Sequence, residues 1–214
     1  ARVGIGGEIA RRDRHCLARI HRIDQKRGQD PRDPRQFERG GSCLGPFEAH
    51  RLERAFERIA EIERGVGHRQ RIAQAYLNDS EALASGREQC SVRIRITGES
   101  ANLNIKSRQA GARRQEFEYP IPLADAESLM RLACEGRIEK VRHLVQVGSH
   151  LWEIDEFAGD NAGLVVAEIE LQHEGEPFDR PDWLGTEVTD CLRFYNMALA
   201  ARPFHHWTAE EKSC

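Results

Sequence analysis

Charged residues recur at every second position in six short stretches between residues 91 and 171, and within each stretch the charges mostly share one sign. Side chains of a β-strand point alternately to its two faces, so each like-charged pair is expected to share a face. Like charges placed side by side are costly unless an opposite charge or a ligand compensates them. The cationic stretches hold Arg93 and Arg95, Lys106, and Lys140 and Arg142; the acidic ones hold Glu116 and Glu118, Glu153 and Asp155, and Glu168 and Glu170.

These residue types favour a ligand that carries both phosphate and metal. Arginine and lysine bind phosphate oxygens, arginine often through two hydrogen bonds at once. Clustered carboxylates suit Mg²⁺ or Mn²⁺, which prefer hard oxygen ligands. The same alternation is also ordinary for an antiparallel sheet with one solvated face, and that alternative stays open. Like-signed pairing on successive strands favours the ionic site.

The elements that position these residues are mainly short strands, with a few helices between them. A stripe of apolar residues predicts a helix over 47–64 and another over 123–135, each followed by a glycine that ends it. Turns are expected around 78–86 and around Gly111, a loop over 174–181, and a short helix or turn over 194–201. The pattern indicates a mainly β (α+β) fold.

Composition narrows the protein class. No apolar run approaches the roughly 20 residues that a membrane helix needs, and the N-terminal residues lack a secretion-signal pattern, which predicts a cytoplasmic protein. Six scattered cysteines without a C-x-x-C pair predict reduced thiols. Residues 1–71 carry 17 of the 32 basic residues but only 11 of the 35 acidic ones. These basic residues are nearly all arginine with little aromatic interleaving, which argues against a nucleic-acid partner.

The ordered series of alternating motifs resembles the CYTH family of triphosphate tunnel metalloenzymes, which includes class IV adenylyl cyclases and thiamine triphosphatases. The resemblance covers about residues 72–207 and also includes Gln74-Ala75-Tyr76-Leu77 and Asp182-Trp183-Leu184-Gly185. It implies an eight-stranded antiparallel tunnel-like β-barrel with flanking helices, incomplete if its first strand is lacking.

The resemblance also implies roles for individual residues. Arg93, Arg95, Lys106 and Arg142 would bind phosphates, and Glu116 and Glu118 would belong to the acidic lining. Glu168 and Glu170 would hold Mg²⁺ or Mn²⁺, with Glu153 and Asp155 as further ligands or water-positioning groups. Tyr76 beside Lys140 would activate the attacking water; the plain alternative is a packed strand tyrosine.

The first strand of the family, with its Glu-x-Glu-x-Lys signature, has no clear counterpart here. The nearest candidate is Glu61-Ile62-Glu63-Arg64-Gly65, where glycine stands in the lysine position and only 12 residues separate Glu63 from Tyr76. Glu61 and Glu63 are either a decayed motif or an accidental likeness on a foreign segment, and we favour the second. In that hypothesis the native reading frame begins at about Arg71–Ile72. The expected division is therefore an irregular or non-native segment 1–60, a tunnel domain 61–207 and a tail 208–214.

The leading functional expectation is metal-dependent hydrolysis of a triphosphate, with inorganic triphosphate as the first candidate. Thiamine triphosphatase and class IV-like adenylyl cyclase activities are the enzymatic alternatives. A non-catalytic tunnel that binds polyphosphate or nucleotides is the alternative from another class, because the defective first strand would remove catalysis. The expected partner is an inorganic or organic triphosphate and not a membrane. The oligomeric state stays open, a homodimer included.

Overall fold

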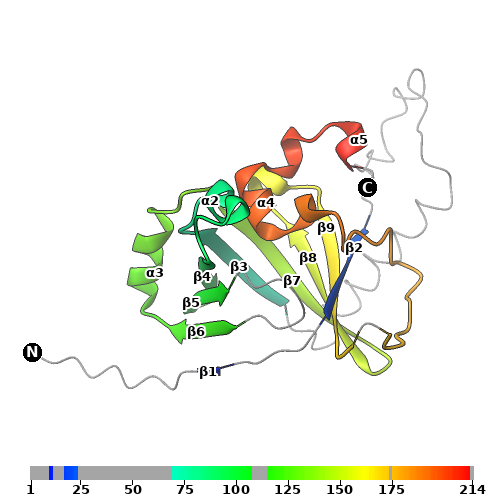
Figure 1. The fold of residues 1–214 in the computed structure, drawn as a ribbon. Helices are drawn as coiled ribbons and strands as arrows, with labels where there is room; N and C mark the ends of the chain where they lie inside the picture. Colours follow the sequence, from blue (N-terminus) through cyan, green and yellow to red (C-terminus); the bar gives the residue numbers. More distant parts are fainter. Residues whose placement is uncertain (1–9, 12–16, 24–68, 108–114, 174, 213–214) are drawn as a thin grey trace, which may run out of the picture.

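Strands dominate the computed structural model, which describes residues 10–11, 17–23, 69–107, 115–173 and 175–212. In this part of the chain nine strands form one antiparallel sheet in the order β1-β6-β5-β4-β3-β7-β8-β9-β2 (Figure 1). The strands are β1 (Ala10–Arg11), β2 (Leu17–Ile23), β3 (Arg69–Tyr76), β4 (Cys90–Thr97), β5 (Ser100–Ser107), β6 (Glu116–Pro120), β7 (Ile138–Val147), β8 (His150–Phe157) and β9 (Val165–Leu171).

The expected mainly β, antiparallel fold with flanking helices is confirmed. Among the described residues the sheet is open, since β1 and β2 stand at opposite ends of the strand order. Irregular structure was the wrong expectation for residues 10–11 and 17–23, because β1 pairs with β6 and β2 pairs with β9 over seven residues. The predicted helix over 47–64, the turn at Gly111, and Glu61 and Glu63 lie outside the described residues.

Two tight hairpins bring the charged strands together. Gly98 joins β4 to β5 with φ +59°, and Gly148 joins β7 to β8 with φ +56°. Glycine adopts this left-handed conformation without the steric cost that a Cβ imposes. At Gly148 an added Cβ would also stand 2.4 Å from Oδ2 of Asp179. These turns set the register in which opposite residues of neighbouring strands share a face.

The helices among the described residues are short. They are α2 (Ser80–Ser85), α3 (Leu123–Met130), α4 (Asn196–Ala201) and α5 (Ala209–Lys212), with 3₁₀ turns at Gly159–Asn161, Leu192–Phe194 and Phe204–His206. A turn was expected where α2 forms. The Asp79 side chain accepts hydrogen bonds from the backbone N–H groups of Glu81 and Ala82, and Gly86 ends the helix at φ +80°. Helix α3 ends at Met130 rather than at residue 135, because the chain turns after it.

One face of the sheet, here called the covered face, carries the alternating apolar residues. Helix α3 packs on it through Ala126 and Met130, against Ile94 of β4. Farther along the sheet, Trp152 of β8 is fully buried against Trp183, with the two rings edge to face at 5.6 Å between centroids. Burial of these side chains supplies the hydrophobic stabilisation on this face.

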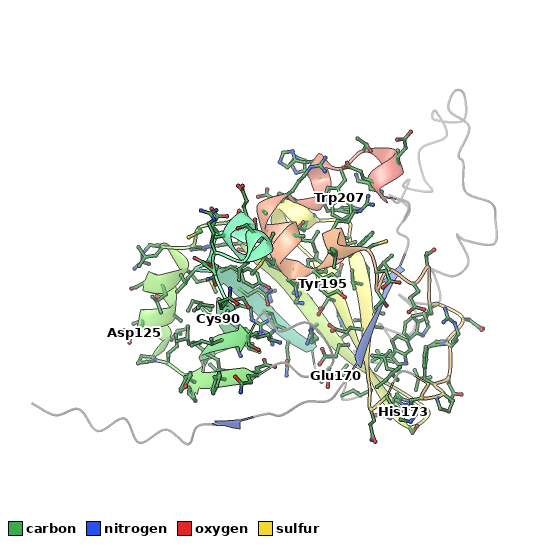
Figure 2. The ribbon with its side chains drawn as sticks, in the orientation of Figure 1. Cys90, Asp125, Glu170, His173, Tyr195 and Trp207 are labelled. Carbon is green, nitrogen blue, oxygen red and sulfur yellow. The ribbon has the colours of Figure 1, made fainter. Side chains whose placement is uncertain are left out.

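The C-terminal segment covers part of the opposite face. Tyr76 of β3 and Phe157 of β8 pack in one apolar cluster with Phe194, Leu199 and Trp207. Figure 1 shows α4 near the upper end of β7, and Figure 2 labels Trp207 above it, among the C-terminal helices. This layer bounds the region in which the charged side chains gather.

Two expectations from composition can be compared with the structure. Among the described residues, no helix is long and apolar enough to cross a membrane. Cys90 and Cys134 are free thiols. Reduced thiols were the wrong expectation for Cys191, which is bonded in a disulfide.

Candidate functional site

The strand register places the predicted ionic residues on one face of the sheet, here called the ionic face. Lys106 lies opposite Glu116, Arg142 opposite Asp155, and Glu153 opposite Glu168. Directly opposed residues of an antiparallel pair point to the same side. The polar residues that the pairings place on this face include Glu116, Glu118, Asn102, Asn104, Lys106, Arg93, Arg95, Gln74, Tyr76, Lys140, Arg142, Glu153, Asp155, Glu168 and Glu170.

The sheet order arranges these charges in three sectors. Glutamates of β6 stand at one side, the cationic residues of β5, β4 and β7 lie in the middle, and the carboxylates of β8 and β9 stand at the other side. Figure 2 labels Glu170 on β9, close to where β2 runs beside that strand. The ionic face therefore offers a central cationic sector with carboxylates on both flanks.

A buried ion-pair network joins β7 to β8. Nζ of Lys140 lies 2.5 Å from Oδ2 of Asp155, and both side chains are almost fully buried. Arg142 donates to both carboxylate oxygens of Asp155, at 2.7 Å each, and also pairs with Glu153. Two-pronged charge-assisted bonds of this kind fix the guanidinium in orientation as well as in position.

The network lowers the pKa of both Lys140 and Asp155, with different consequences for their charge. Burial lowers the pKa of Lys140 to about 8, with Asp155 opposing the shift and Arg142 adding to it. Burial alone would raise the pKa of Asp155, but the charges and hydrogen bonds of Lys140 and Arg142 outweigh it and hold the pKa below its usual value. Asp155 is thus ionised at neutral pH, while Lys140 can lose its proton at a pH close to neutral.

Arg93 and Arg95 have less compensation. Nε of each guanidinium is buried and has no hydrogen-bond partner among the described residues. Nη2 of Arg95 donates to Gln74 at a long 3.4 Å. Burial, with the nearby charges of Arg93 and Arg142, lowers the pKa of Arg95 to about 10. Donors that are buried without a partner cost free energy, so these groups are suited to an anionic ligand.

Lys106 extends the cationic sector toward β6. Its Nζ lies 3.1 Å from a carboxylate oxygen of Glu116, and its side chain is 38% exposed. Burial and the charge of Arg93 lower the pKa of Lys106, and Glu116 opposes them. Partial exposure means that this pair contributes little to stability, and it leaves the ammonium accessible to a ligand.

Tyr76 and Lys140 are not placed side by side. Lys140 lies opposite Ile72 in the register, four residues along β3 from Tyr76, which corresponds to about 13 Å. Burial raises the pKa of Tyr76, although Arg93 and Arg95 lower it in part. A tyrosine with a raised pKa holds its proton at neutral pH, so Tyr76 is poorly suited to act as a base.

Only some of the carboxylate oxygens of β8 and β9 are available to bind a metal ion. Both oxygens of Asp155 accept hydrogen bonds from Lys140 and Arg142. Among the described residues, no three histidine, cysteine, aspartate or glutamate side chains are grouped to hold a metal ion. Burial, with the charge of Asp155, raises the pKa of Glu168 despite the nearby Arg142. A nearby cation would relieve this burden. Glu153 and Glu168, which are opposed across β8 and β9, and Glu170 on the same face have the oxygen chemistry that a hard divalent ion prefers, although they are not grouped closely enough to form a ligand set.

Sequence reasoning missed two neutral residues of the ionic face. Gln74 is fully buried and connects Tyr76 to Arg95, at 3.5 and 3.4 Å. Asn104 is 2% exposed, and its Oδ1 has no hydrogen-bond partner among the described residues. Uncharged side chains do not stand out in a charge pattern. The signal for Asn104 was its place in the alternation of β5, and Gln74 was visible only as part of the motif Gln74-Ala75-Tyr76-Leu77, without a role.

Comparison with known proteins relates this arrangement to one family. The model of the CYTH domain family matches residues 47–197. An inorganic triphosphatase of Nitrosomonas europaea is 32% identical over 152 residues, which are 70% of this chain and 95% of that protein. An inorganic triphosphatase of Acetivibrio thermocellus is 42% identical over 118 residues, which are 55% of this chain and 76% of that protein.

A solved structure agrees in fold. The crystal structure of an inorganic triphosphatase superposes with a TM-score of 0.53 at 23% identity, covering 86% of this chain and 93% of that one. The family match begins at residue 47, upstream of Ile72, where the resemblance was expected to begin. The family match spans residues 47–197, which include every strand from β3 to β9, and the match to the Nitrosomonas relative covers 70% of this chain. The chain belongs to the CYTH domain family.

Proposed function

We propose that this protein hydrolyses inorganic triphosphate with the help of a divalent metal ion. The observation that carries the proposal is the ionic face, in which a buried cationic sector lies between carboxylates. The names of the two relatives, both inorganic triphosphatases, support it. Triphosphate is a linear polyanion, and its charge matches a row of cations drawn from three strands.

The cationic sector would bind the phosphoryl groups. Arg93 and Arg95 have buried Nε donors that lack partners among the described residues, and Lys106 is partly accessible. Arg142 is already held by Asp155 and Glu153, so it is preorganised and contributes positive charge. When water attacks the terminal phosphoryl group, preorganised cations stabilise the negative charge that develops on the leaving pyrophosphate without reorganising during the reaction.

Lys140 is the better of the two predicted proton acceptors. Its pKa of about 8 places it near the working range of a base at mildly alkaline pH. When neutral, its amine would take a proton from the attacking water, while Asp155 holds the amine in place. Tyr76, with its raised pKa, would stay protonated and act as a hydrogen-bond donor.

Glu153, Glu168 and Glu170 would hold the divalent ion, proposed to be Mg²⁺ or Mn²⁺; CYTH triphosphatases are generally metal-dependent. The bound ion supplies charge neutralisation at the phosphoryl oxygens. Asp155, whose two oxygens are occupied by Lys140 and Arg142, serves in this account as a positioning residue rather than as a ligand. Which of the two metals is used is part of the proposal to be tested.

A substrate screen tests this function. Phosphate release would be measured with inorganic triphosphate, ATP and thiamine triphosphate, each with Mg²⁺, with Mn²⁺ and with a chelator. We expect turnover of inorganic triphosphate that requires metal and exceeds turnover of the other two. Cyclic product from ATP, or preference for thiamine triphosphate, would replace the proposed substrate by one of the enzymatic alternatives.

A second candidate is a protein that binds triphosphate without turnover. It is favoured by the lack, among the described residues, of three metal-ligating side chains grouped together. Calorimetric titration with inorganic triphosphate separates the two candidates. Binding without phosphate release at any metal concentration would favour this second candidate. As part of the proposed hydrolase function, we also propose a cytoplasmic location and an organic triphosphate as second substrate.

A further inference from the structure

We infer that Asn104 is a further substrate-contacting residue, whose side-chain amide hydrogen-bonds to the bound triphosphate. The inference rests on the proposed binding of triphosphate at the ionic face. It adds a neutral residue to a set so far composed of charged groups. Nothing in the charge pattern of the sequence, and nothing in the names of the relatives, assigns a role to this residue.

The position of Asn104 brings it to the side of the cationic sector that borders β6. On β5 it lies opposite Arg93 of β4 and opposite Glu118 of β6. Lys106 follows two residues later and therefore points to the same face. Asn104 thus has Arg93 and Lys106 of the proposed phosphate-binding set as neighbours, with the carboxylate of Glu118 on its other side.

The carbonyl end of the Asn104 side chain is buried without a hydrogen-bond partner among the described residues. Asn104 is 2% exposed, and its Oδ1 has no hydrogen-bond partner among the described residues. Nε of neighbouring Arg93 is buried in the same condition. Buried polar groups of folded proteins nearly always have partners, so two unpartnered groups from adjacent strands on one face require an explanation. A ligand seated between them would supply both partners.

The chemistry of the amide fits a phosphoryl group and its bound water. An amide carries both a donor and an acceptor end. The NH₂ end can donate to an anionic phosphoryl oxygen, and Oδ1 can accept from a protonated phosphoryl oxygen or from water. Arginine and lysine can only donate, so Asn104 provides the acceptor that the cationic sector lacks.

The test replaces the amide by a side chain of similar size. Asn104→Leu would be compared with Asn102→Leu, which lies on the same strand and the same face, opposite Arg95, but is less buried. For each protein, thermal unfolding is recorded and inorganic triphosphate is titrated by calorimetry without metal, so that binding is read independently of turnover.

Two opposite changes are expected in Asn104→Leu. The dissociation constant for inorganic triphosphate should rise about tenfold or more, as for loss of a hydrogen bond to a charged group. The melting temperature without ligand should stay or rise, because an unpartnered buried amide is replaced by an apolar group. A second variant, Asn104→Asp, should bind even more weakly, because its carboxylate repels the polyanion. Asn102→Leu should change affinity by less than about twofold.

Unchanged triphosphate affinity in Asn104→Leu and Asn104→Asp would overturn the inference. So would a lower melting temperature with unchanged affinity, which indicates a packing role. If the unaltered protein binds triphosphate through Asn104 but releases no phosphate, the inference stands while the proposed hydrolysis fails. If the unaltered protein does not bind triphosphate, both fail.

Discussion

Asp155 accepts hydrogen bonds from two cations, and this determines what the cationic sector can do. Lys140 and Arg142 are adjacent on one face of β7, and both are buried. Without a shared carboxylate, two buried like charges would repel each other and lose their solvation. The structure therefore makes Asp155 the residue on which the arrangement of this sector depends.

We predict that Asp155→Asn destabilises the protein by about 3 to 5 kcal/mol, because it leaves buried cations uncompensated. Since the folded-state pKa of Asp155 lies below its unfolded value of 3.8, its contribution is fully present above that pH and is lost as the pH falls further. Urea unfolding at neutral pH would measure the loss. The exposed Asp190→Asn serves as control. Equal stability of the two variants would contradict the role given to Asp155.

Lys140 gives a prediction for the pH dependence of turnover. The neutral amine is the proposed base, so the rate should rise with pH toward its pKa of about 8 and then level off. In Lys140→Arg the positive charge is retained but cannot be lost. We expect kcat to fall by about 100-fold or more, as for loss of a general base, with a smaller change in KM. An unchanged rise with pH in this variant would assign the base elsewhere.

The charged residues of the ionic face could be predicted from the sequence, whereas the partners that they contact could not. The like-signed alternation was enough to predict that Arg93, Arg95, Lys140 and Arg142 share a face. That Asp155 would be occupied by two of these cations depends on the register between β7 and β8, which the sequence does not show. The same holds for the separation of Tyr76 from Lys140 along β3.

The C-terminal elements close one end of the ionic face. Trp207 is 6% exposed and packs edge to face against Phe194, with centroids 5.0 Å apart, and against Phe204. Its indole N–H donates to the backbone oxygen of Arg202. This cluster also contains Tyr76, so it supports the site from one side.

We predict that Trp207→Ala costs about 3 to 5 kcal/mol of stability, because it leaves a cavity in this cluster. Trp207→Phe keeps most of the buried area and should cost clearly less. Thermal and urea unfolding of both variants would give the difference. If alanine and phenylalanine were equally tolerated, the C-terminal layer would not be part of the folded core.

Strands were easier to predict than helices. Each of the six charged stretches lies within a strand from β4 to β9, because a period of two is a direct reading of strand geometry. The sequence predicts a turn where helix α2 forms, since six residues are too few to show a helical stripe. The signal that could have found it was local: Asp79 as N-cap, and Gly86 as the left-handed residue that follows the helix.

At the scale of the molecule, β2 departs from the expected fold, in which residues 1–60 were irregular or non-native. β2 pairs along β9, the strand that carries Glu168 and Glu170. An edge strand left unpaired presents free backbone groups and promotes association between chains. Residues far from the charged motifs in sequence thus protect the strand on which metal binding is proposed.

We predict that deletion of residues 1–23 exposes the β9 edge and leads to self-association. Size-exclusion chromatography with light scattering would detect oligomers or aggregates, and the melting temperature would fall. A deleted chain that stays monodisperse with an unchanged melting temperature would show that β2 does not protect this edge.

Sequence reasoning could not foresee this arrangement, because residues 1–46 lack a sustained period. A strand that adds to an existing edge takes its register from its partner, and its own residue pattern gives little indication of it.

The hypothesis that the native reading frame begins near Arg71 stays a prediction, to be tested on the encoding DNA. Because the family match begins at residue 47, a search of the encoding DNA for the Glu-x-Glu-x-Lys motif should start near that residue.

The central claim is that the ionic face binds and hydrolyses triphosphate, and charge reversal within it tests this most directly. Metal-dependent phosphate release from inorganic triphosphate would be compared in the unaltered protein, in Arg95→Glu and in Arg87→Glu, which lies exposed after α2. We predict that kcat/KM falls by about 1,000-fold or more in Arg95→Glu and stays within about twofold in Arg87→Glu. Equal activity of the three proteins would contradict the account.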